Sequence, residues 1–219
     1  MDPAEKVIAV SAEQMRRIDE RAVHEFKIPV LTLMERAGNA VALECLKTIR
    51  VKKIANPKVL VLCGGGKNAG DGLVAARRLY LAKIPVSAIL LKPADSFKDA
   101  VLANFNEIVR LDLPYEEVPE FVSIKRKIAE CNLVIDSILG TGLKRRITGL
   151  MRQSIQAVNA SVKIVDAVDI PSGLDADTAK IHGVCIRADV TVTMGASPKG
   201  CIGAGRERIH SSRTGRRDR

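Results

Sequence analysis

The chain has 219 residues, of which 47% are hydrophobic, and this is enough for one domain with a full core. Only 3% are aromatic and there is no Trp, so we expect an aliphatic core. The formal net charge is +10, and residues 203–219 hold +4 of it, with six Arg against Glu207 and Asp218. Because no basic patch is interleaved with aromatic residues, the sequence argues against a surface that stacks nucleic-acid bases.

The cysteines are scattered and odd in number, which argues against a disulfide framework and against a zinc knuckle. We expect each to be a small buried hydrophobe in a reducing compartment. The first residues show no signal-peptide pattern, and no segment is long enough to span a bilayer. These features predict a cytoplasmic protein without a membrane association.

Two helices are predicted first. Ser11 followed by Gln14 fits a capping box, and apolar residues recur at helical spacing over 11–26. A second helix of small and apolar residues is marked from Met34 to Leu46 and is broken by Asn56–Pro57.

Short apolar runs then alternate with helical patterns. Parallel strands buried on both faces read as such runs, so the alternation predicts an α/β fold with a doubly wound parallel sheet. The predicted strands are 58–63, 86–91, 132–136, 162–169 and 188–194, and the predicted helices are 70–83, 96–110, 120–130 and 150–159. Ligands of such sheets bind beyond the carboxyl ends of the strands, so the site is expected there.

A glycine-rich stretch, residues 64–72, follows the first of these strands. It fits the G-x-G-x-x-G/A pattern of dinucleotide-binding turns, but the next strand ends in Lys92 and lacks the acidic residue that reads a ribose. The stretch is either a tight turn or a cradle for an anionic group at a helix start. Asn68 and Asp71 favour the cradle, because polar side chains inside a glycine turn need partners.

Two later strand ends also carry polar groups. Asp136 ends one strand, and Gly140–Gly142 and three basic residues follow it. This segment is either a binding site for a phosphate or a surface loop whose basic residues are solvated. Asp169 and Ser172 follow the next strand, whereas Asp166 in its middle is predicted to be structural. Carboxylate, amide and hydroxyl oxygens at three strand ends suit a hard cation, which the sequence alone leaves unnamed.

Five segments resemble the motifs of the YjeF N-terminal domain family, the NAD(P)H-hydrate epimerases, and they occur in the family's order. The segments are "QMRRIDERAVHEFKIPVLTLMERAG" (14–38), "KNAGDGLVAARRL" (67–79), "VIDSILGTGL" (134–143), "VDIPSGLDADT" (168–178) and "ADVTVTMGASPKG" (188–200). The resemblance implies a Rossmann-like three-layer sandwich preceded by two helices, with the domain at 1–202 and a basic, disordered tail at 203–219.

The resemblance also implies an activity, the interconversion of the R and S epimers of hydrated NADH and NADPH. A dehydratase that accepts the S epimer is the implied functional partner, and a homodimer through the helices at 11–49 is the implied assembly. One potassium ion per subunit is implied, with Asn68, Asp136 and Ser172 as its ligands. Asp169 is the expected catalytic residue, with Asp71 as the second candidate. The expected substrate contacts are Lys67, Asn68, Ala69, Gly70, Asp71, Gly140, Thr141, Gly142, Leu143, Lys144, Arg145, Arg146 and Asp169.

The chain departs from the family pattern in the glycine turn and at its end. Gly65 replaces a Pro, Lys67 an Asn and Ala69 a Gly, and Ala69 is unfavourable if that position needs a positive φ. After Gly200 the sequence offers no closing apolar strand.

Two alternatives to the epimerase stay open. The first is a non-catalytic interaction module, a protein or RNA scaffold, and the second is a phosphate-binding Rossmann oxidoreductase. The three carboxylates at strand ends favour the enzyme, because burying them is costly for a module that does not use them.

Overall fold

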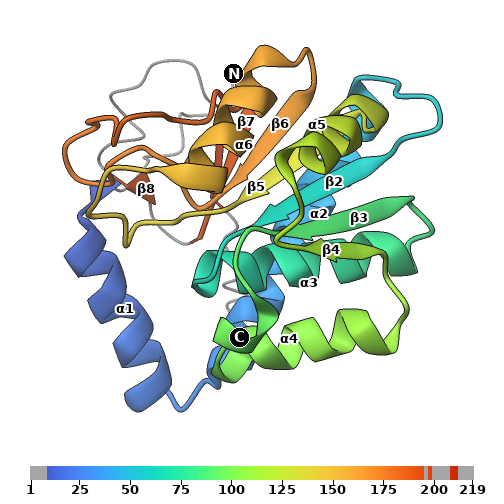
Figure 1. Cartoon of the computed structure of the whole chain (residues 1–219). Coiled ribbons are helices and arrows are strands. Elements are labelled where there is room, and N and C mark those ends of the chain that lie inside the picture. The colour runs from blue at the N-terminus through green and yellow to red at the C-terminus, as the bar shows by residue number, and fades with distance from the viewer. Residues whose placement is uncertain (1–8, 195–196, 199–207, 212–219) are drawn as a thin grey trace, which may run out of the picture.

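A computed structural model of the chain describes residues 9–194, 197–198 and 208–211, and it is an α/β sandwich (Figure 1). One parallel sheet has the strand order β4-β3-β2-β5-β6-β7-β9, and a small second sheet pairs β1 with β8. The strands are β1 (Ala9–Val10), β2 (Val59–Cys63), β3 (Val86–Leu90), β4 (Tyr115–Glu117), β5 (Leu133–Ser137), β6 (Ile164–Val168), β7 (Val190–Thr193), β8 (Ser197–Pro198) and β9 (Arg208–Ser211).

Six helices and one short 3₁₀ turn connect or flank these strands within the described ranges. They are α1 (Ala12–His24), α2 (Val30–Val51), α3 (Lys67–Leu81), the 3₁₀ turn η1 (Ala94–Ser96), α4 (Asp99–Arg110), α5 (Phe121–Glu130) and α6 (Gly149–Ala160). The chain runs outward from β2 through β3 to β4 and then returns to β5 on the other side of β2. The strand order therefore reverses between β2 and β5, where doubly wound sheets bind ligands.

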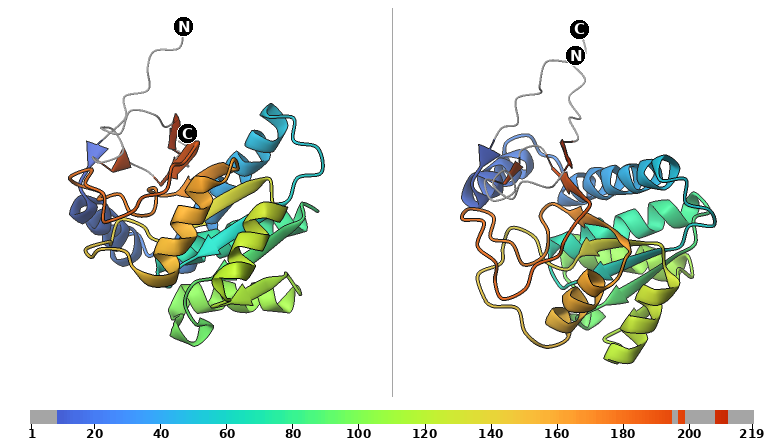
Figure 2. Two further views of the ribbon diagram at one scale, coloured as in Figure 1. Left: turned by 45° about the horizontal axis from the view of Figure 1, so that its top comes forward. Right: turned by 90° about the horizontal axis from the view of Figure 1, so that it is seen from above.

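Two apolar layers hold the sandwich together. The cluster on one face joins the sheet to α2, α3 and α4, and the cluster on the other face joins it to α5 and α6. The view from above in Figure 2 shows α2 and α3 on one side of the sheet and α5 and α6 on the other. The largest fully buried side chains are all Leu or Ile, so the prediction of an aliphatic core is confirmed.

The helix α1 lies to the side of the sandwich and contains no buried residue (Figure 1). Its start is the predicted capping box, in which the Ser11 hydroxyl accepts from the Gln14 N–H and the Gln14 side chain accepts from the Ser11 N–H. The Ala12 N–H also donates to Oδ1 of Asp177, 2.8 Å away, in the segment that follows β6. This bond holds α1 near the carboxyl ends of the strands.

Glycines let α3 and the end of β2 approach β5 closely. A Cβ on Gly72 of α3 would lie 2.0 Å from the Ser137 hydroxyl, and one on Gly64 would lie 1.9 Å from the Ile138 carbonyl oxygen. Part of the glycine-rich stretch therefore serves packing, as the tight-turn alternative predicts.

Several elements differ from the sequence predictions. The helix α3 begins at Lys67 and not at Gly70, because residues 67–70 take helical geometry despite their loop-like composition. The strand β4 lies at an edge of the sheet and is short and polar, so no apolar run marks it.

The tail at 203–219 was predicted to be disordered, but residues 208–211 form β9 and pair in parallel with β7. An edge strand is held by backbone hydrogen bonds to one neighbour, so this pairing does not need the apolar run that the prediction required. The rest of this tail lies outside the described residues.

No helix within the described ranges is long and apolar enough to cross a membrane.

Candidate functional site

Three segments converge at the carboxyl edge of the sheet. They are the first turn of α3, the loop between β5 and α6, and the turn after β6. Gly140 lies where they meet, since a Cβ on this residue would be 3.3 Å from Oδ2 of Asp169 and 3.4 Å from Cγ of Asn68. The structure therefore brings Asn68, Gly140 and Asp169 together from three parts of the sequence.

Asp136 and Ser172 form a buried hydrogen-bonded pair beside this point. The Ser172 hydroxyl donates to Oδ1 of Asp136 at 2.6 Å, and the Ser172 N–H donates to Oδ2 at 2.8 Å. The Ile138 N–H also donates to Oδ1, and the Leu139 N–H donates to the Ser172 hydroxyl at 2.8 Å. Burial raises the pKa of Asp136 to about 6, although the hydrogen bonds from Ser172 and Ile138 oppose the shift.

Asn68 is buried in the first turn of α3, and neither its amide oxygen nor its amide nitrogen has a hydrogen-bond partner. A buried amide without partners costs about 1–3 kcal/mol, so such groups usually face a ligand. Asn68 and Asp169 both lie beside Gly140. The residue before Gly140, Leu139, donates its N–H to the Ser172 hydroxyl, so Ser172 lies close to the same point. The amide is therefore available to a group bound at the junction.

Asp169 adopts a backbone conformation that is rare for residues other than glycine. Its φ is +66°, and the Ile170 N–H donates to the Val168 carbonyl oxygen across it at 2.8 Å. Its own N–H donates to Val192 of β7 at 2.8 Å. A γ-turn with positive φ is strained, and such strain clusters at functional sites.

The Asp169 carboxyl is linked to the loop after β5. Burial raises its pKa to about 6, while a hydrogen bond from the Thr141 N–H opposes the rise and the charge of Asp19 adds to it. A group with this pKa is mainly ionised at neutral pH and takes up a proton readily, as a general base or acid requires.

Asp71 is half-buried one turn into α3, and its pKa lies well above the ordinary value. Burial is the main cause, the charges of Asp169 and Asp19 add to it, and Lys67 opposes it. The site thus holds two carboxyl groups, and a negative charge on one makes ionisation of the other less favourable. One cation, Lys67, lies nearby.

Asp19 is the residue that the sequence analysis did not single out. It lies on α1, is exposed, and faces Lys67, Asp71 and Asp169 closely enough to interact with each electrostatically. Its place in the first family-like segment, 14–38, is the signal that could have found it.

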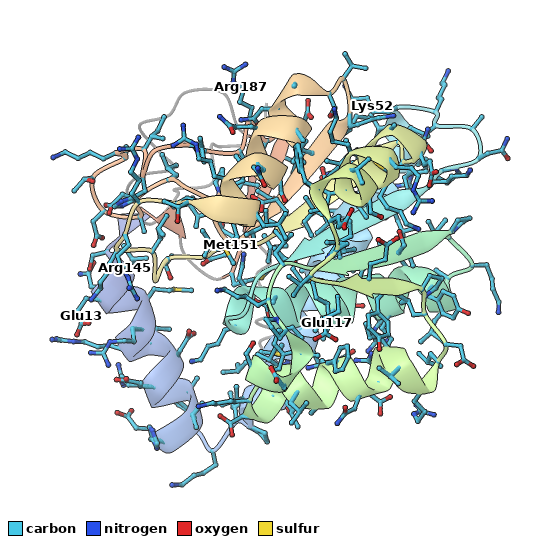
Figure 3. The ribbon with its side chains drawn as sticks, viewed as in Figure 1. Glu13, Lys52, Glu117, Arg145, Met151 and Arg187 are labelled. Atoms are coloured by element: carbon cyan, nitrogen blue, oxygen red, sulfur yellow. The ribbon has the colours of Figure 1, made fainter. Side chains whose placement is uncertain are left out.

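The remaining predicted substrate contacts lie on the same edge. Gly70 is buried in α3, Thr141 and Leu143 are partly buried in the β5–α6 loop, and Gly142 is exposed. Lys144, Arg145 and Arg146 are exposed on that loop, and Figure 3 shows Arg145 on the side of the molecule where α1 lies.

The side chain of Arg146 lies against another loop, because a Cβ on Gly183 would be 2.9 Å from Cγ of Arg146.

The two departures within α3 are accommodated. Ala69 is helical and fully buried, and its N–H donates to the Gly66 carbonyl oxygen, so the position does not need a positive φ. Lys67 is exposed at the start of the helix. The substitutions therefore leave the turn intact and add a cation to its rim.

The site has the donors of an oxygen-rich cation site. Asn68 offers an unpartnered amide oxygen, and Asp136 and Ser172 offer a carboxylate and a hydroxyl. The part of the chain that the structure describes holds no cluster of three His, Cys, Asp or Glu side chains arranged for a metal ion. The donor set suits a hard cation, which prefers carboxylate, carbonyl and hydroxyl oxygens.

Comparison with known proteins gives close relatives over most of the chain. It is 36% identical over 197 residues to a protein of Elusimicrobium minutum named NAD(P)H-hydrate epimerase, and the match covers 89% of each chain. A protein of the same name from Oenococcus oeni is 35% identical over 199 residues, again with 89% of each covered. A bifunctional NAD(P)H-hydrate repair enzyme of Thermofilum pendens is 35% identical over 87% of this chain, which spans 36% of that protein.

A solved structure shares the fold. The crystal structure of the yeast protein YNL200c superposes with a TM-score of 0.82 at 20% identity, over 94% of this chain and 88% of the yeast chain. Residues 30–200 match the family described as YjeF-related protein N-terminus. The predicted resemblance is thereby confirmed, and the chain belongs to the family of YjeF-related protein N-termini.

Proposed function

We propose that this protein is an NAD(P)H-hydrate epimerase, an isomerase that interconverts the R and S epimers of hydrated NADH and NADPH. The names of relatives that match nearly the full chain support this activity. The observation on which it rests is the pair of carboxyl groups, Asp71 and Asp169, whose pKa values are both raised at the carboxyl edge of the sheet. Nothing in the described residues favours a scaffold or an oxidoreductase over this function.

Epimerisation at C6 of the hydrated nicotinamide ring requires a bond to that carbon to break and re-form on the other face. Either the C6 hydroxyl leaves as water, or the bond between C6 and the ring nitrogen opens to an aldehyde. The first route delivers a proton to the leaving oxygen and removes one from the returning water. The second moves a proton from the hydroxyl to the nitrogen and back. Both routes need a group that gives and takes one proton.

Asp169 is suited to that task. Its pKa of about 6 lets it exchange a proton at neutral pH, and its ionised form stabilises positive charge on the ring. Burial and the charge of Asp169 raise the pKa of Asp71 well above the ordinary value, so Asp71 is the second candidate for a proton-transfer role. Two carboxyl groups in different surroundings are a common basis for acid and base roles in one site.

A potassium ion fits the oxygen donors at the junction, and Asn68, Asp136 and Ser172 are the residues that would hold it. The unpartnered amide of Asn68 supports this assignment, because it otherwise remains buried without a hydrogen bond. When bound, such an ion would supply positive charge where the three segments converge, in a site for an anionic nucleotide. The β5–α6 loop adds further positive charge at this edge through the exposed Lys144, Arg145 and Arg146.

The protein is a cytoplasmic homodimer that works with a dehydratase strict for the S epimer. The free thiols of Cys45, Cys63, Cys131 and Cys185 suit a reducing compartment. The exposed apolar residues of α1 and the turn after it, such as Phe26 at 68% exposure, support a dimer surface in this region. Bifunctional relatives that are named repair enzymes support the functional partnership with the dehydratase.

The test is a coupled assay with a mixture of R- and S-hydrated NADH and an S-specific dehydratase. Without an epimerase, NADH forms in a fast phase and then slowly, as the R epimer converts spontaneously. Adding this protein with potassium should make recovery fast and complete. A folded protein that leaves the slow phase unchanged would refute the epimerase function.

A further inference from the structure

The two substrates of the proposed reaction differ at one position of the adenosine ribose. Hydrated NADPH carries a 2′-phosphate there, and hydrated NADH carries a hydroxyl. In parallel sheets that bind dinucleotides at a glycine turn, the end of the neighbouring strand reads this position, with an acid for the hydroxyl or a cation for the phosphate. The side chain at that strand end therefore decides whether hydrated NADPH or hydrated NADH is preferred.

In this chain the neighbouring strand is β3. It pairs in parallel with β2, with Cys63 opposite Leu90, and the Leu91 N–H donates to the Cys63 carbonyl oxygen at 2.8 Å. The next residue, Lys92, is thereby placed beside the glycine turn that follows β2.

Lys92 lies directly against this turn. A Cβ on Gly65 would be 3.2 Å from Cγ and 3.5 Å from Cβ of Lys92, and 4.0 Å from the Ser96 hydroxyl. The aliphatic stem of Lys92 therefore occupies the space beside the exposed Gly65 backbone, as long cationic side chains often do. A proline at position 65, as in the family pattern, would press on that stem.

Lys92 is exposed and makes no ion pair with any residue of the described ranges. A neighbouring acid, Glu117 at the end of β4 (Figure 3), accepts a hydrogen bond from the Ala94 N–H at 3.0 Å. Lys67 adds a second exposed cation at the other end of the turn.

We propose that Lys92, lying over Gly65 at the end of β3, binds the ribose 2′-phosphate and makes this protein prefer hydrated NADPH to hydrated NADH. The proposal rests on the proposed epimerase function, which supplies the two substrates. A flexible ammonium beside the exposed backbone of a glycine turn is a common setting for a phosphate.

Two measurements test this proposal separately from the proposed epimerase function. The first is kcat/KM for hydrated NADPH and hydrated NADH, in wild type and in Lys92→Ala and Lys92→Glu. Losing a charged hydrogen bond should lower kcat/KM for hydrated NADPH roughly ten- to hundredfold and leave hydrated NADH within about twofold. Lys98→Ala is the matched control, an exposed lysine near the start of α4, and it should keep the wild-type ratio.

The second measurement is calorimetric binding of NADP⁺ and NAD⁺, which does not depend on turnover. Tighter binding of NADP⁺ by wild type, lost in Lys92→Ala but not in Lys98→Ala, would support the proposal. Equal affinities in wild type, or equal losses for both nucleotides in Lys92→Ala, would overturn it. A preserved NADP⁺ preference with no epimerisation of either substrate would instead refute the proposed function.

Discussion

Two buried aspartates on adjacent strands have opposite surroundings. Asp136, at the end of β5, accepts hydrogen bonds from the Ser172 hydroxyl, the Ser172 N–H and the Ile138 N–H. Asp166, in the middle of β6 opposite Ile135, has no hydrogen-bond partner on either carboxyl oxygen. Burial raises both pKa values, to about 6 for Asp136 and about 7 for Asp166.

The difference shows what the carboxyl edge of a parallel sheet provides. Beyond the last ladder residue, backbone N–H groups of the following loops are free to stabilise a carboxylate, whereas inside the ladder they are used by neighbouring strands. Glu44 and Asp189 add like charge near Asp166 and raise its pKa further. An acid at the edge can therefore serve a site, while an acid inside the sheet mainly costs stability.

The largest expected effect is at the edge, in the variant Asp169→Asn. Asn tolerates a positive φ, so the turn should be retained while the proton-transfer group is lost. We expect kcat to fall about 10²- to 10⁴-fold, measured in the dehydratase-coupled assay. Asp95→Asn, at an exposed position far from the junction in sequence, is the control. Activity within threefold of wild type would remove Asp169 from the mechanism.

The second prediction concerns the interior acid. The pKa of Asp166 in the folded protein lies above the ordinary 3.8. Between these two pKa values the Asp166 carboxyl stays protonated in the folded protein and is ionised in the unfolded chain. Stability is therefore lost as the pH rises from about 4 to about 7, by up to roughly 4 kcal/mol. Asp166→Asn and Asp166→Val should remove this loss and be more stable than wild type at pH 8.

Urea unfolding at pH 4.5 and pH 8 checks this prediction. Asp112→Asn, an exposed aspartate with positive φ, should unfold with the wild-type pH dependence. If Asp166→Asn were equally or less stable than wild type at pH 8, a compensating partner for Asp166 would have to exist.

A smaller effect tests the cation at the junction through Asn68→Ala. Since the buried amide of Asn68 makes no hydrogen bond in the fold and therefore costs stability, the variant should be at least as stable as wild type in the absence of potassium. Potassium should stabilise wild type by roughly 1–3 kcal/mol at concentrations well above its dissociation constant, and it should not stabilise the variant. Thermal midpoints in potassium chloride and in sodium chloride of equal ionic strength measure both. Equal potassium stabilisation of the two proteins would exclude Asn68 as a ligand.

The smallest predicted effect is that of Asp19 on α1. Its negative charge raises the pKa of Asp169 and of Asp71, so Asp19→Asn should lower both. The acid limb of kcat/KM should move to lower pH by less than about one unit, because Asp19 is exposed and screened. Glu20→Gln, whose partner is Arg16, is the control, and 0.5 M salt should reduce the difference. A shift toward higher pH would contradict the placement of Asp19.

The sequence predicts the inner strands well, because burial on both faces leaves mostly apolar residues in them. The strands β2 and β5 are buried along their full length, and only Asp136 and Ser137 at the end of β5 break the apolar run. The edge strands β4 and β9 lack such a run and were not predicted.

The site could be predicted only in part. Asn68, Asp136 and Ser172 were singled out from the sequence because polar residues at strand ends meet at one edge of the sheet. The positive φ of Asp169 could not be read from an aspartate, since the γ-turn is imposed by the bond from its N–H to β7. Asp19 was missed because exposed acids are common on helices. Only the three-dimensional structure shows that this one lies close enough to Asp71 and Asp169 to interact with them.

The measurement that tests the central claim most directly is the fate of pure R-hydrated NADH with this protein alone. Chromatography that resolves the two epimers would follow the mixture in potassium buffer, with Asp169→Asn beside wild type. We predict rapid formation of the S epimer up to the equilibrium ratio with wild type, and only the spontaneous rate with the variant. Conversion by folded wild type at the rate of the protein-free control would contradict the claim that this carboxyl edge is an epimerase site.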